Sequence, residues 1–257
     1  MYQYVYDAAL SDKRHHLALT AIENRLTDLG IQGRIDRLSL FKNVAESIEE
    51  GVRRGVTTVV AVGNDDTVKK VMDAVPQFAV TMGVIPIGKP SKIARLLGVP
   101  EGIAACDVLS ARLTQTLDIG RVNGHHFLAA LSVPAGAVTL DCEGQYRVTA
   151  PPRGPVHVCN MTPLETLLDE DAAPIHQADP SDGLLEAVIP ARRGIFRSGE
   201  GGSKTVLNLR RLTIRAERPF TYVVDGRSHS AQRAEVDVLP GRLKVIVGRN
   251  RLFRVPT

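Results

Sequence analysis

The sequence lacks several features that mark particular classes of protein. Its 257 residues contain no Trp, 4% aromatic residues and three cysteines. Few aromatics argue against a stacking platform for single-stranded nucleic acid, so we expect no nucleic-acid partner. The cysteines, at positions 106, 142 and 159, are widely spaced and form no CxxC pair. This argues against a zinc site or a disulfide framework and favours a reducing compartment.

Long hydrophobic runs are also missing. No apolar stretch approaches the roughly 20 residues that a membrane-spanning helix requires. Residues 1–16 place their charges after the apolar stretch, unlike a secretory signal. With 44% hydrophobic and 23% charged residues, the composition is that of a globular chain that can bury a substantial core. We therefore expect a cytoplasmic protein.

Charge is distributed unevenly along the chain. Residues 192–254 hold fifteen Lys and Arg against five Asp and Glu, whereas the remainder holds seventeen against twenty-three. A basic surface attracts phosphates or anionic headgroups, so one interpretation is peripheral contact with an anionic membrane. The other is that Arg is simply the preferred solvent-facing residue on strands.

The first half of the chain alternates strand and helix signals. Strands are predicted at 2–6, 57–62 and 80–87, and helices at 13–29, 43–54, 67–74, 91–97 and 103–113. Such alternation is typical of a parallel sheet with helices on both faces. We predict a three-layer α/β domain over residues 1–118.

From about residue 117 strand signals dominate. Strands are predicted at 117–122, 126–133, 136–141, 145–149, 156–160, 184–189, 204–216, 220–224, 234–239 and 242–248. Turn pairs such as Asn123-Gly124, Asp225-Gly226 and Pro240-Gly241 separate several of them. We predict an all-β, antiparallel, sandwich-like domain over 119–257, whose final residues 249–257 pack back on the first domain. A helical turn at 163–169 and a flexible loop at 198–203 are also expected. Edge-strand pairing makes a homodimer an option.

Two loops of the first half connect a strand to a helix, where open α/β sheets bind ligands. In the first, residues 63–67 (GNDDT), free N–H groups at the helix start would suit a phosphate. Asp66 or Thr67 would be the N-cap. The adjacent carboxylates of Asp65 and Asp66 would repel a bare phosphate and suit one only with Mg²⁺ between. Equally, acidic residues and Thr stabilise a helix start without a ligand.

The second loop lies in residues 86–92 and repeats this layout. Lys89 and Lys92 lie in or beside the turn, where their ammonium groups could meet phosphate oxygens. The alternative needs no ligand, because a Pro at the first helical turn with a Ser cap stabilises a helix by itself.

The order of these motifs resembles the soluble bacterial lipid kinases with a diacylglycerol-kinase catalytic domain, a family related to sphingosine kinases and, more distantly, to NAD kinases. The resemblance covers nearly the whole chain. Its matching stretches are GNDDT (63–67), PIGKPSKIAR (86–95), LDIGRVNGHHFL (117–128), SDGLLEAVI (181–189), VVDGRSHS (223–230) and LPGRLKVIV (239–247). The resemblance implies transfer of a phosphoryl group from ATP, with Mg²⁺, to a lipid or other small hydroxyl compound.

The same resemblance implies roles for individual residues. Asp65 and Asp118 would be catalytic and would organise Mg²⁺. Asn160 and Arg227 would face the substrate cleft, and Asp182 would belong to a structural Mg²⁺ site. The nucleotide would be held by Gly63, Asn64, Asp65, Asp66, Thr67, Gly88, Lys89, Ser91 and Lys92.

The sequence also departs from the family at positions that matter for chemistry. Asn64 and Asp66 replace glycines of the family's GGDGT motif, and Lys92 replaces an acidic residue. Arg227 stands where the family has a Glu that resembles the base, and an arginine stays protonated. A helical insertion that the family carries after the segment matching 132–136 is missing. Two hypotheses stay open: an ATP- and Mg²⁺-dependent lipid kinase, and a catalytically inactive kinase-like protein that binds a nucleotide, a lipid or a partner.

Overall fold

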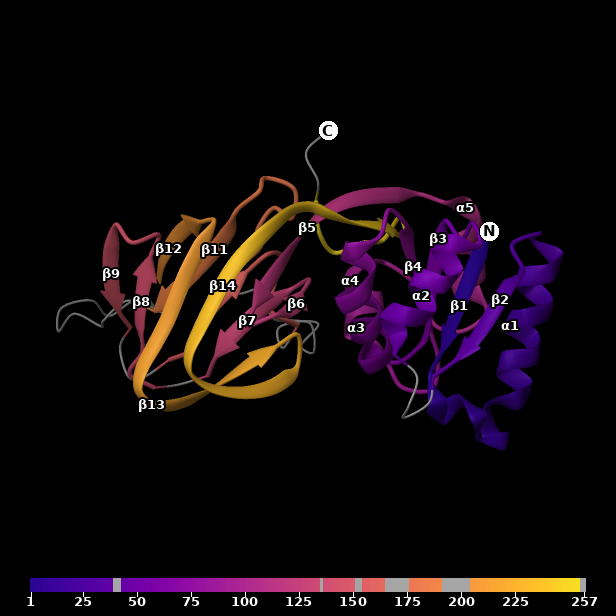
Figure 1. Ribbon diagram of the computed structural model, residues 1–257, viewed down its shortest axis with the longest axis horizontal. Coiled ribbons are helices and arrows are strands. Elements are labelled where there is room, and N and C mark those ends of the chain that lie inside the picture. The colour runs from indigo at the N-terminus through magenta and orange to yellow at the C-terminus, as the bar shows by residue number, and fades with distance from the viewer. Residues whose placement is uncertain (39–42, 135, 151–153, 165–175, 191–203, 255–257) are drawn as a thin grey trace. The chain divides into compact units, whose positions relative to one another are not determined.

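The computed structural model describes residues 1–38, 43–134, 136–150, 154–164, 176–190 and 204–254 (Figure 1). The chain separates into two compact units. The first comprises Met1–Leu117 with Arg242–Arg254, and the second comprises Asp118–Gly241.

A parallel sheet forms the centre of the first unit. It contains β1 (Tyr2–Tyr6), β2 (Gly33–Arg37), β3 (Thr58–Gly63), β4 (Thr81–Pro86) and the last residues of β14 (Arg227–Ile246), in the order β2-β1-β3-β4-β14. Every residue of β1, β3 and β4 is buried, as expected for strands covered on both faces. The edge strand β2 was not predicted, because its sequence GRIDR is mostly polar and only Asp36 is buried.

Helices cover this sheet in two groups. In one group, α3 (Asp65–Ala74) contacts both α2 (Val44–Arg53) and α4 (Lys92–Leu96); in the other, α1 (His16–Asp28) contacts α5 (Ala104–Ala111). Short 3₁₀ turns lie at Ala8–Ser11, Lys13–His15 and Val75–Gln77. α1 buries Leu19, Ile22 and Leu26, which lie at helical spacing. The predicted α/β architecture with a parallel sheet is therefore confirmed.

The C-terminal residues complete the first unit. Val245 pairs with Met82 of β4, and the N–H of Val247 donates to the carbonyl of Leu113 over 2.8 Å. Two glycines allow the backbones to meet: a Cβ on Gly98 would lie 2.4 Å from the Arg251 nitrogen, and one on Gly248 would lie 1.8 Å from the Gly98 oxygen. Residues 242–254, which we call the C-terminal tail, are thus part of this unit's core.

The second unit is built from antiparallel strands. One run has the order β12-β11-β10-β7-β13-β14; β8 and β9 extend from β13, and β5 and β6 extend from β14. Its core contains Phe127, Leu140, Ile214, Val224 and Val236. The predicted antiparallel all-β architecture is confirmed. The strands are β5 (Thr114–Val122), β6 (His125–Phe127), β7 (Ala130–Val133), β8 (Thr139–Cys142), β9 (Tyr146–Thr149), β10 (Val156–Cys159), β11 (Leu185–Pro190), β12 (Lys204–Leu209) and β13 (Arg211–Val224).

Several predicted strand limits were wrong. The stretch 126–133 forms two strands rather than one, and 204–216 is divided at Arg210 between β12 and β13. Asn123-Gly124 and Asp225-Gly226 do form two-residue hairpin turns with positive φ angles. Gly241 also has a positive φ, but β14 continues through it. The predicted loop at 198–203 and most of the turn at 163–169 lie outside the described residues.

Two further observations concern the absences noted in the sequence. The three cysteines are free and buried. Within the described residues, no helix is both long and apolar enough to cross a bilayer.

Candidate functional site

The strand order of the first unit indicates where a ligand would bind. The connection from β1 leads to β2 on one side, and the connection from β3 leads to β4 on the other side, so the strand order reverses between β1 and β3. Ligands of open α/β sheets bind at the carboxyl ends of the strands at such a point. A cavity of about 230 Å³ lies at the ends of β1, β3 and β4. We call it the strand-end cavity. It is lined by Asp7, Ala9, Leu10, Arg14, His15, Asn64, Ile87, Gly88 and Lys89.

The loop after β3 is fastened to the end of β1. The Thr67 hydroxyl donates to the carboxylate of Asp7, which also accepts the N–H of Ala9 over 2.8 Å. Gly63 has φ +151°, and a Cβ there would lie 2.9 Å from the Asp7 Cβ and from the Thr67 Oγ1. Only glycine fits this position. Sequence reasoning missed Asp7, although its place directly after the first strand was a signal.

The N-terminus of α3 carries its own cap. The side-chain oxygen of Asn64 accepts the N–H of Asp66 at 2.9 Å and of Thr67 at 3.4 Å. The prediction that Asp66 or Thr67 is the N-cap was wrong, because Asn64 is the extended residue before the first turn, where a side chain reaches these amides. Amides expected to be free for a phosphate are therefore already bonded.

Asp65 is held by the start of the next helix. Its carboxylate accepts the Ser91 hydroxyl and the backbone N–H groups of Lys92 at 3.0 Å and Ile93 at 3.2 Å. Ser91 is the N-cap of α4 and accepts the N–H of Ala94 over 3.0 Å. The structure thus brings Asp65, Ser91 and Lys92 together, and in this contact the carboxylate stabilises α4.

These residues do not fit a bound Mg²⁺. Mg²⁺ requires near-octahedral oxygen ligands, usually including one or two carboxylates. Both oxygens of Asp65 already accept protein donors, and Lys92 brings a positive charge to the neighbouring position. Across the described residues, no group of three or more His, Cys, Asp or Glu could hold a metal ion. We therefore assign no chemical step to a metal here.

Two cationic side chains, Arg14 and Lys89, and the imidazole of His15 also line the strand-end cavity. Arg14 and Lys89 are exposed, and His15 is half-buried. The Arg14 Nε donates to the His15 Nε2 over 3.1 Å and lies 3.3 Å from an Asp12 carboxylate oxygen. Gly88, with φ +90°, brings the second loop close to the His15 ring. Arg14 and His15 were missed, although the KRHH run at 13–16 was visible in the sequence.

In the second unit, motif residues hold backbone segments. Asp118 is 2% exposed and accepts the N–H groups of Gly183 and Gly241, each over 2.7 Å. The Asn160 side-chain amide donates to the carbonyls of Asp118 at 3.0 Å and Leu128 at 2.8 Å. These contacts give Asp118 and Asn160 structural functions.

The hairpin that carries Arg227 is anchored next to Asn160. Asp225 is 5% exposed and accepts the N–H groups of Leu128, Ala129 and Ala130 at 2.8–3.1 Å. Asn160 donates to the same three-residue segment from its other side, so the structure brings Asn160 and the 225–227 turn to one place. Arg227 itself follows the turn and pairs with Val224.

Asp182 is an exposed residue that precedes β11. Its carboxylate accepts the N–H of Leu184 over 2.9 Å. Partial burial raises the pKa of Asp182, and the charges of Asp179 and Asp118 act in the same direction while the Leu184 N–H opposes them. The Mg²⁺ site expected there stays a prediction.

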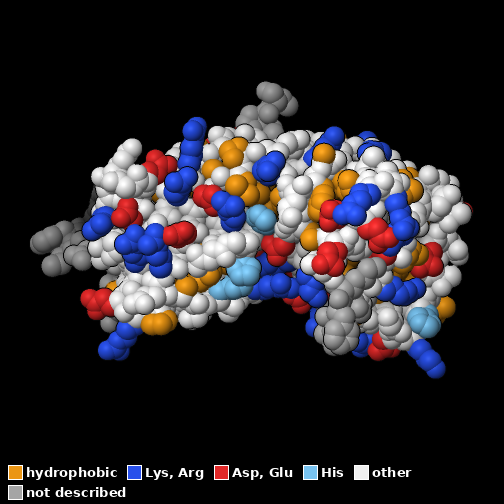
Figure 2. Space-filling model, in the orientation of Figure 1, with side chains coloured by type: hydrophobic (Ala, Val, Ile, Leu, Met, Phe, Trp, Pro, Cys, Tyr) orange, Lys and Arg blue, Asp and Glu red, His pale blue; other side chains and the backbone are white. Residues whose placement is uncertain are grey.

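Basic side chains of the molecule do not form one uniform patch on the face seen in Figure 2. Lys and Arg are interleaved there with Asp and Glu. In the second unit, Arg121 pairs with Asp237 at 2.6 Å and Arg233 with Glu235 at 2.6 Å. The membrane contact and the homodimer stay predictions.

Comparisons with known proteins agree with this architecture. The profile of the "Diacylglycerol kinase catalytic domain" family matches residues 7–122. The "Diacylglycerol kinase" of Bacillus subtilis (strain 168) is 30% identical over 90 residues, which are 34% of this chain and 30% of that protein. The "Probable lipid kinase YegS" of Salmonella heidelberg (strain SL476) is 24% identical over 262 residues, 85% of this chain and 87% of that protein.

A solved structure shares the fold over almost the whole chain. The crystal structure of a diacylglycerol kinase from Bacillus anthracis str. Sterne superposes with a TM-score of 0.74 at 18% sequence identity, covering 98% of both chains. Over residues 7–122 the chain is therefore similar to the diacylglycerol kinase catalytic domain, and it shares its fold with a bacterial diacylglycerol kinase.

Proposed function

We propose that the protein binds the phosphate groups of ATP in the strand-end cavity, as a kinase-like binding protein that transfers no phosphoryl group. One observation carries the proposal: the cavity lies at the point where the strand order reverses, and it presents Arg14 and Lys89. An Arg guanidinium matches phosphate oxygens with two parallel donors, and a Lys ammonium adds a compact positive charge.

The size of the cavity limits what it holds. At about 230 Å³ it is smaller than the roughly 300–1,000 Å³ of sites that enclose a drug-sized ligand. It accommodates the phosphate groups, while the nucleoside lies outside. Since Asn64 already caps α3, the side chains of Arg14 and Lys89 supply the donors instead.

Calorimetric titration with ATP, with and without Mg²⁺, tests this proposal. We expect binding that does not need Mg²⁺, and a Kd raised about tenfold in Lys89→Gln and again in Arg14→Gln, for roughly 1.4 kcal/mol per lost contact. Lys70→Gln is the matched control, because Lys70 is exposed on α3 outside the cavity lining. An equal loss in Lys70→Gln, or no binding at millimolar ATP, would reject the proposal.

A second candidate is the family's activity, ATP- and Mg²⁺-dependent phosphorylation of a lipid or other small hydroxyl acceptor. The match of residues 7–122 and the similarity over 85% of the chain favour it. It requires Asp65 to exchange its Ser91, Lys92 and Ile93 donors for a metal. Arg227 cannot be its base, because the guanidinium stays protonated.

Transfer of radiolabelled phosphate to diacylglycerol in mixed micelles separates the two candidates. A labelled lipid product that needs Mg²⁺ and disappears in Asp65→Asn would establish the kinase. The absence of product from a preparation that binds ATP supports the binding function. Asn keeps a side-chain oxygen for the α4 amides, so the variant tests charge more than capping.

A further inference from the structure

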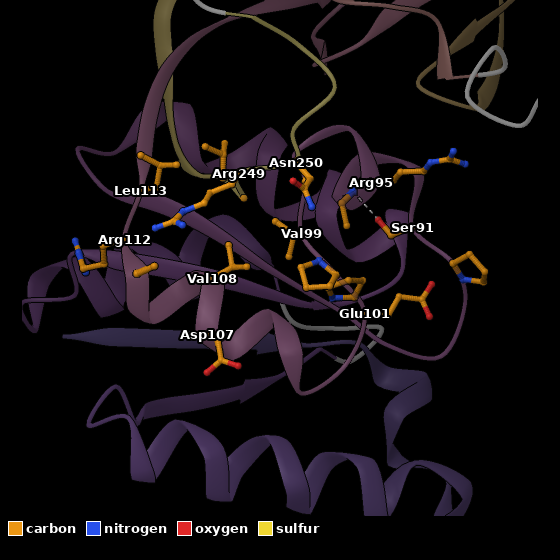
Figure 3. A pocket seen from close by; sticks show the side chains of 18 residues that line it. Ser91, Arg95, Val99, Glu101, Asp107, Val108, Arg112, Leu113, Arg249 and Asn250 are labelled. Atoms are coloured by element: carbon orange, nitrogen blue, oxygen red, sulfur yellow. Dashed lines mark hydrogen bonds between the residues drawn. The ribbon is translucent and has the colours of Figure 1, made fainter. Parts of the chain in front are cut away.

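The first unit contains a second and larger cavity, of about 960 Å³, between α4, α5 and the C-terminal tail (Figure 3). We call it the tail cavity. None of its lining residues lines the strand-end cavity. Its volume lies within the range of sites that bind small molecules.

Most of the tail cavity is apolar. Its walls include Val99, Pro100, Val108, Leu113 and Val247. In Figure 3 the side chains of Val99 and Val108 point into the same space, which Asn250 enters from the tail side. Leu113 is 39% exposed, so its side chain offers apolar surface to a ligand in this cavity.

The cavity is lined by more basic than acidic side chains: Arg95, Arg112 and Arg249 against Glu101 and Asp107. Asp107 points away from the cavity in Figure 3 and lies 2.5 Å from Arg25, which neutralises it. Arg112 donates to the hydroxyls of Tyr2 at 2.8 Å and Thr58 at 3.4 Å, neither of which carries a charge.

Arg249 is the cation best placed to meet a ligand. It is exposed, lines the cavity and extends over it beside Val108. Among the residues that the structure describes, it makes no ion pair with a carboxylate. Its guanidinium is therefore available to an anion.

We propose that the tail cavity binds a small amphipathic anion. The apolar body lies against Val99, Val108 and Leu113, and a carboxylate or phosphate head accepts paired N–H groups from Arg249. Asn250 adds an amide that can donate to the same head. A ligand of this chemistry matches both halves of the lining, whereas a neutral or cationic amphiphile matches only the apolar half.

Four probes with one alkyl chain test the proposal: octanoate, octyl phosphate, octanol and octyltrimethylammonium. They are titrated calorimetrically, below their micelle concentrations, into the full chain. We expect saturable binding of one or both anions, binding of octanol at least tenfold weaker, and no binding of the cation. The relative affinities of octanoate and octyl phosphate identify the head group.

Two variants localise the binding. Arg249→Gln should weaken the anions about tenfold and leave octanol unchanged, whereas Arg254→Gln should change nothing, because Arg254 is exposed on the same tail outside the lining. Val108→Glu places a like charge inside the cavity and should abolish anion binding, with circular dichroism checking the fold. Octanol binding as tightly as the anions, full affinity in Arg249→Gln, or no anion binding at millimolar concentration would overturn the proposal.

Discussion

The two units use different means to hold the segments that carry the motifs. In the second unit, Asp118 and Asp225 are nearly inaccessible, and each gathers backbone N–H groups from segments far away in sequence. In the first unit, the half-buried Asp65 has the same role for α4 beside a cavity, and Gly98 and Gly248 seat the C-terminal tail. An aspartate in a motif that resembles a kinase can therefore stabilise the fold in either unit. The units differ in solvent access: Asp118 and Asp225 are buried, whereas Asp65 is half-buried.

The largest effect is expected from Asp225→Ala. The change leaves the N–H groups of Leu128, Ala129 and Ala130 without their acceptor in a buried place. We expect a loss of about 3–5 kcal/mol in the free energy of unfolding, measured by urea titration. Hydrogen exchange read by mass spectrometry should show the loss in peptides of the second unit; faster exchange in the first unit alone would contradict the comparison.

The Gly98→Ala variant tests how the C-terminal tail is held in the first unit. Gly98 has φ +70°, and the new Cβ would meet backbone of the tail at 2.4 Å, so we expect a loss of about 2–4 kcal/mol confined to the first unit. Gly102→Ala is the matched control, because Gly102 has φ +65° and no atom within 4 Å of its Cβ position. It should cost about 1 kcal/mol. Equal losses would show that strain, rather than tail packing, dominates.

Asp65→Ala should have a moderate effect. Removal of a capping acceptor costs about 1–2 kcal/mol, while Asp65→Asn should cost less. If the carboxylate is structural, the ATP affinity of Asp65→Asn stays within about twofold of wild type, for a difference below roughly 0.5 kcal/mol. A large drop in ATP affinity with unchanged stability would give Asp65 a functional part and break the analogy with Asp225.

The smallest effect concerns pH and Asp182. The pKa of Asp182 is raised in the folded protein above the ordinary 3.8. Folding therefore takes up a proton at pH values just above 3.8, and the contribution of Asp182 to the free energy of unfolding falls as the pH rises through this range. The Asp182→Asn variant lacks this pH dependence, so its free energy of unfolding relative to that of wild type should increase from pH 3.5 to pH 6. An unchanged difference across the titration would contradict it. Added Mg²⁺ that raises the Tm of wild type alone would indicate the metal site expected from the sequence.

Much of the architecture could be predicted from local patterns. The apolar runs at 57–62 and 80–87 and the Gly-terminated helices predict a parallel α/β unit, and the Asn123-Gly124 and Asp225-Gly226 pairs predict hairpins. The edge strand β2 could not be predicted, since its polar sequence has neither strand alternation nor an apolar run. The joining of 234–239 and 242–248 into one strand depends on tertiary contacts, because Gly241 donates to Asp118.

The candidate site could be predicted only in part. The order of the motifs predicted Asp65, Ser91 and Lys92 as residues of one site, and they do lie together. Motif order did not reveal that donors of α4 would occupy Asp65, because these partners lie 26–28 residues away in sequence and depend on the fold. The Asn64 cap is local, since its partners Asp66 and Thr67 lie two and three residues away. Asp7 and Arg14 lie in a segment without a recognisable motif, and only the packing of β1 beside β3 brings them to the cavity.

The C-terminal tail has a consequence for how the chain is made. Residues 242–254 complete the first unit, yet the ribosome synthesises them only after residues 118–241 of the second unit. Domains usually fold in the order in which they emerge, at about 5–20 residues per second. Here residues 118–241 emerge before residues 242–254, so the first unit waits, with its β4 edge still unpaired, until the tail has emerged. The N-terminal half is therefore the last to mature, and its dependence on chaperones during translation should exceed that of the C-terminal half.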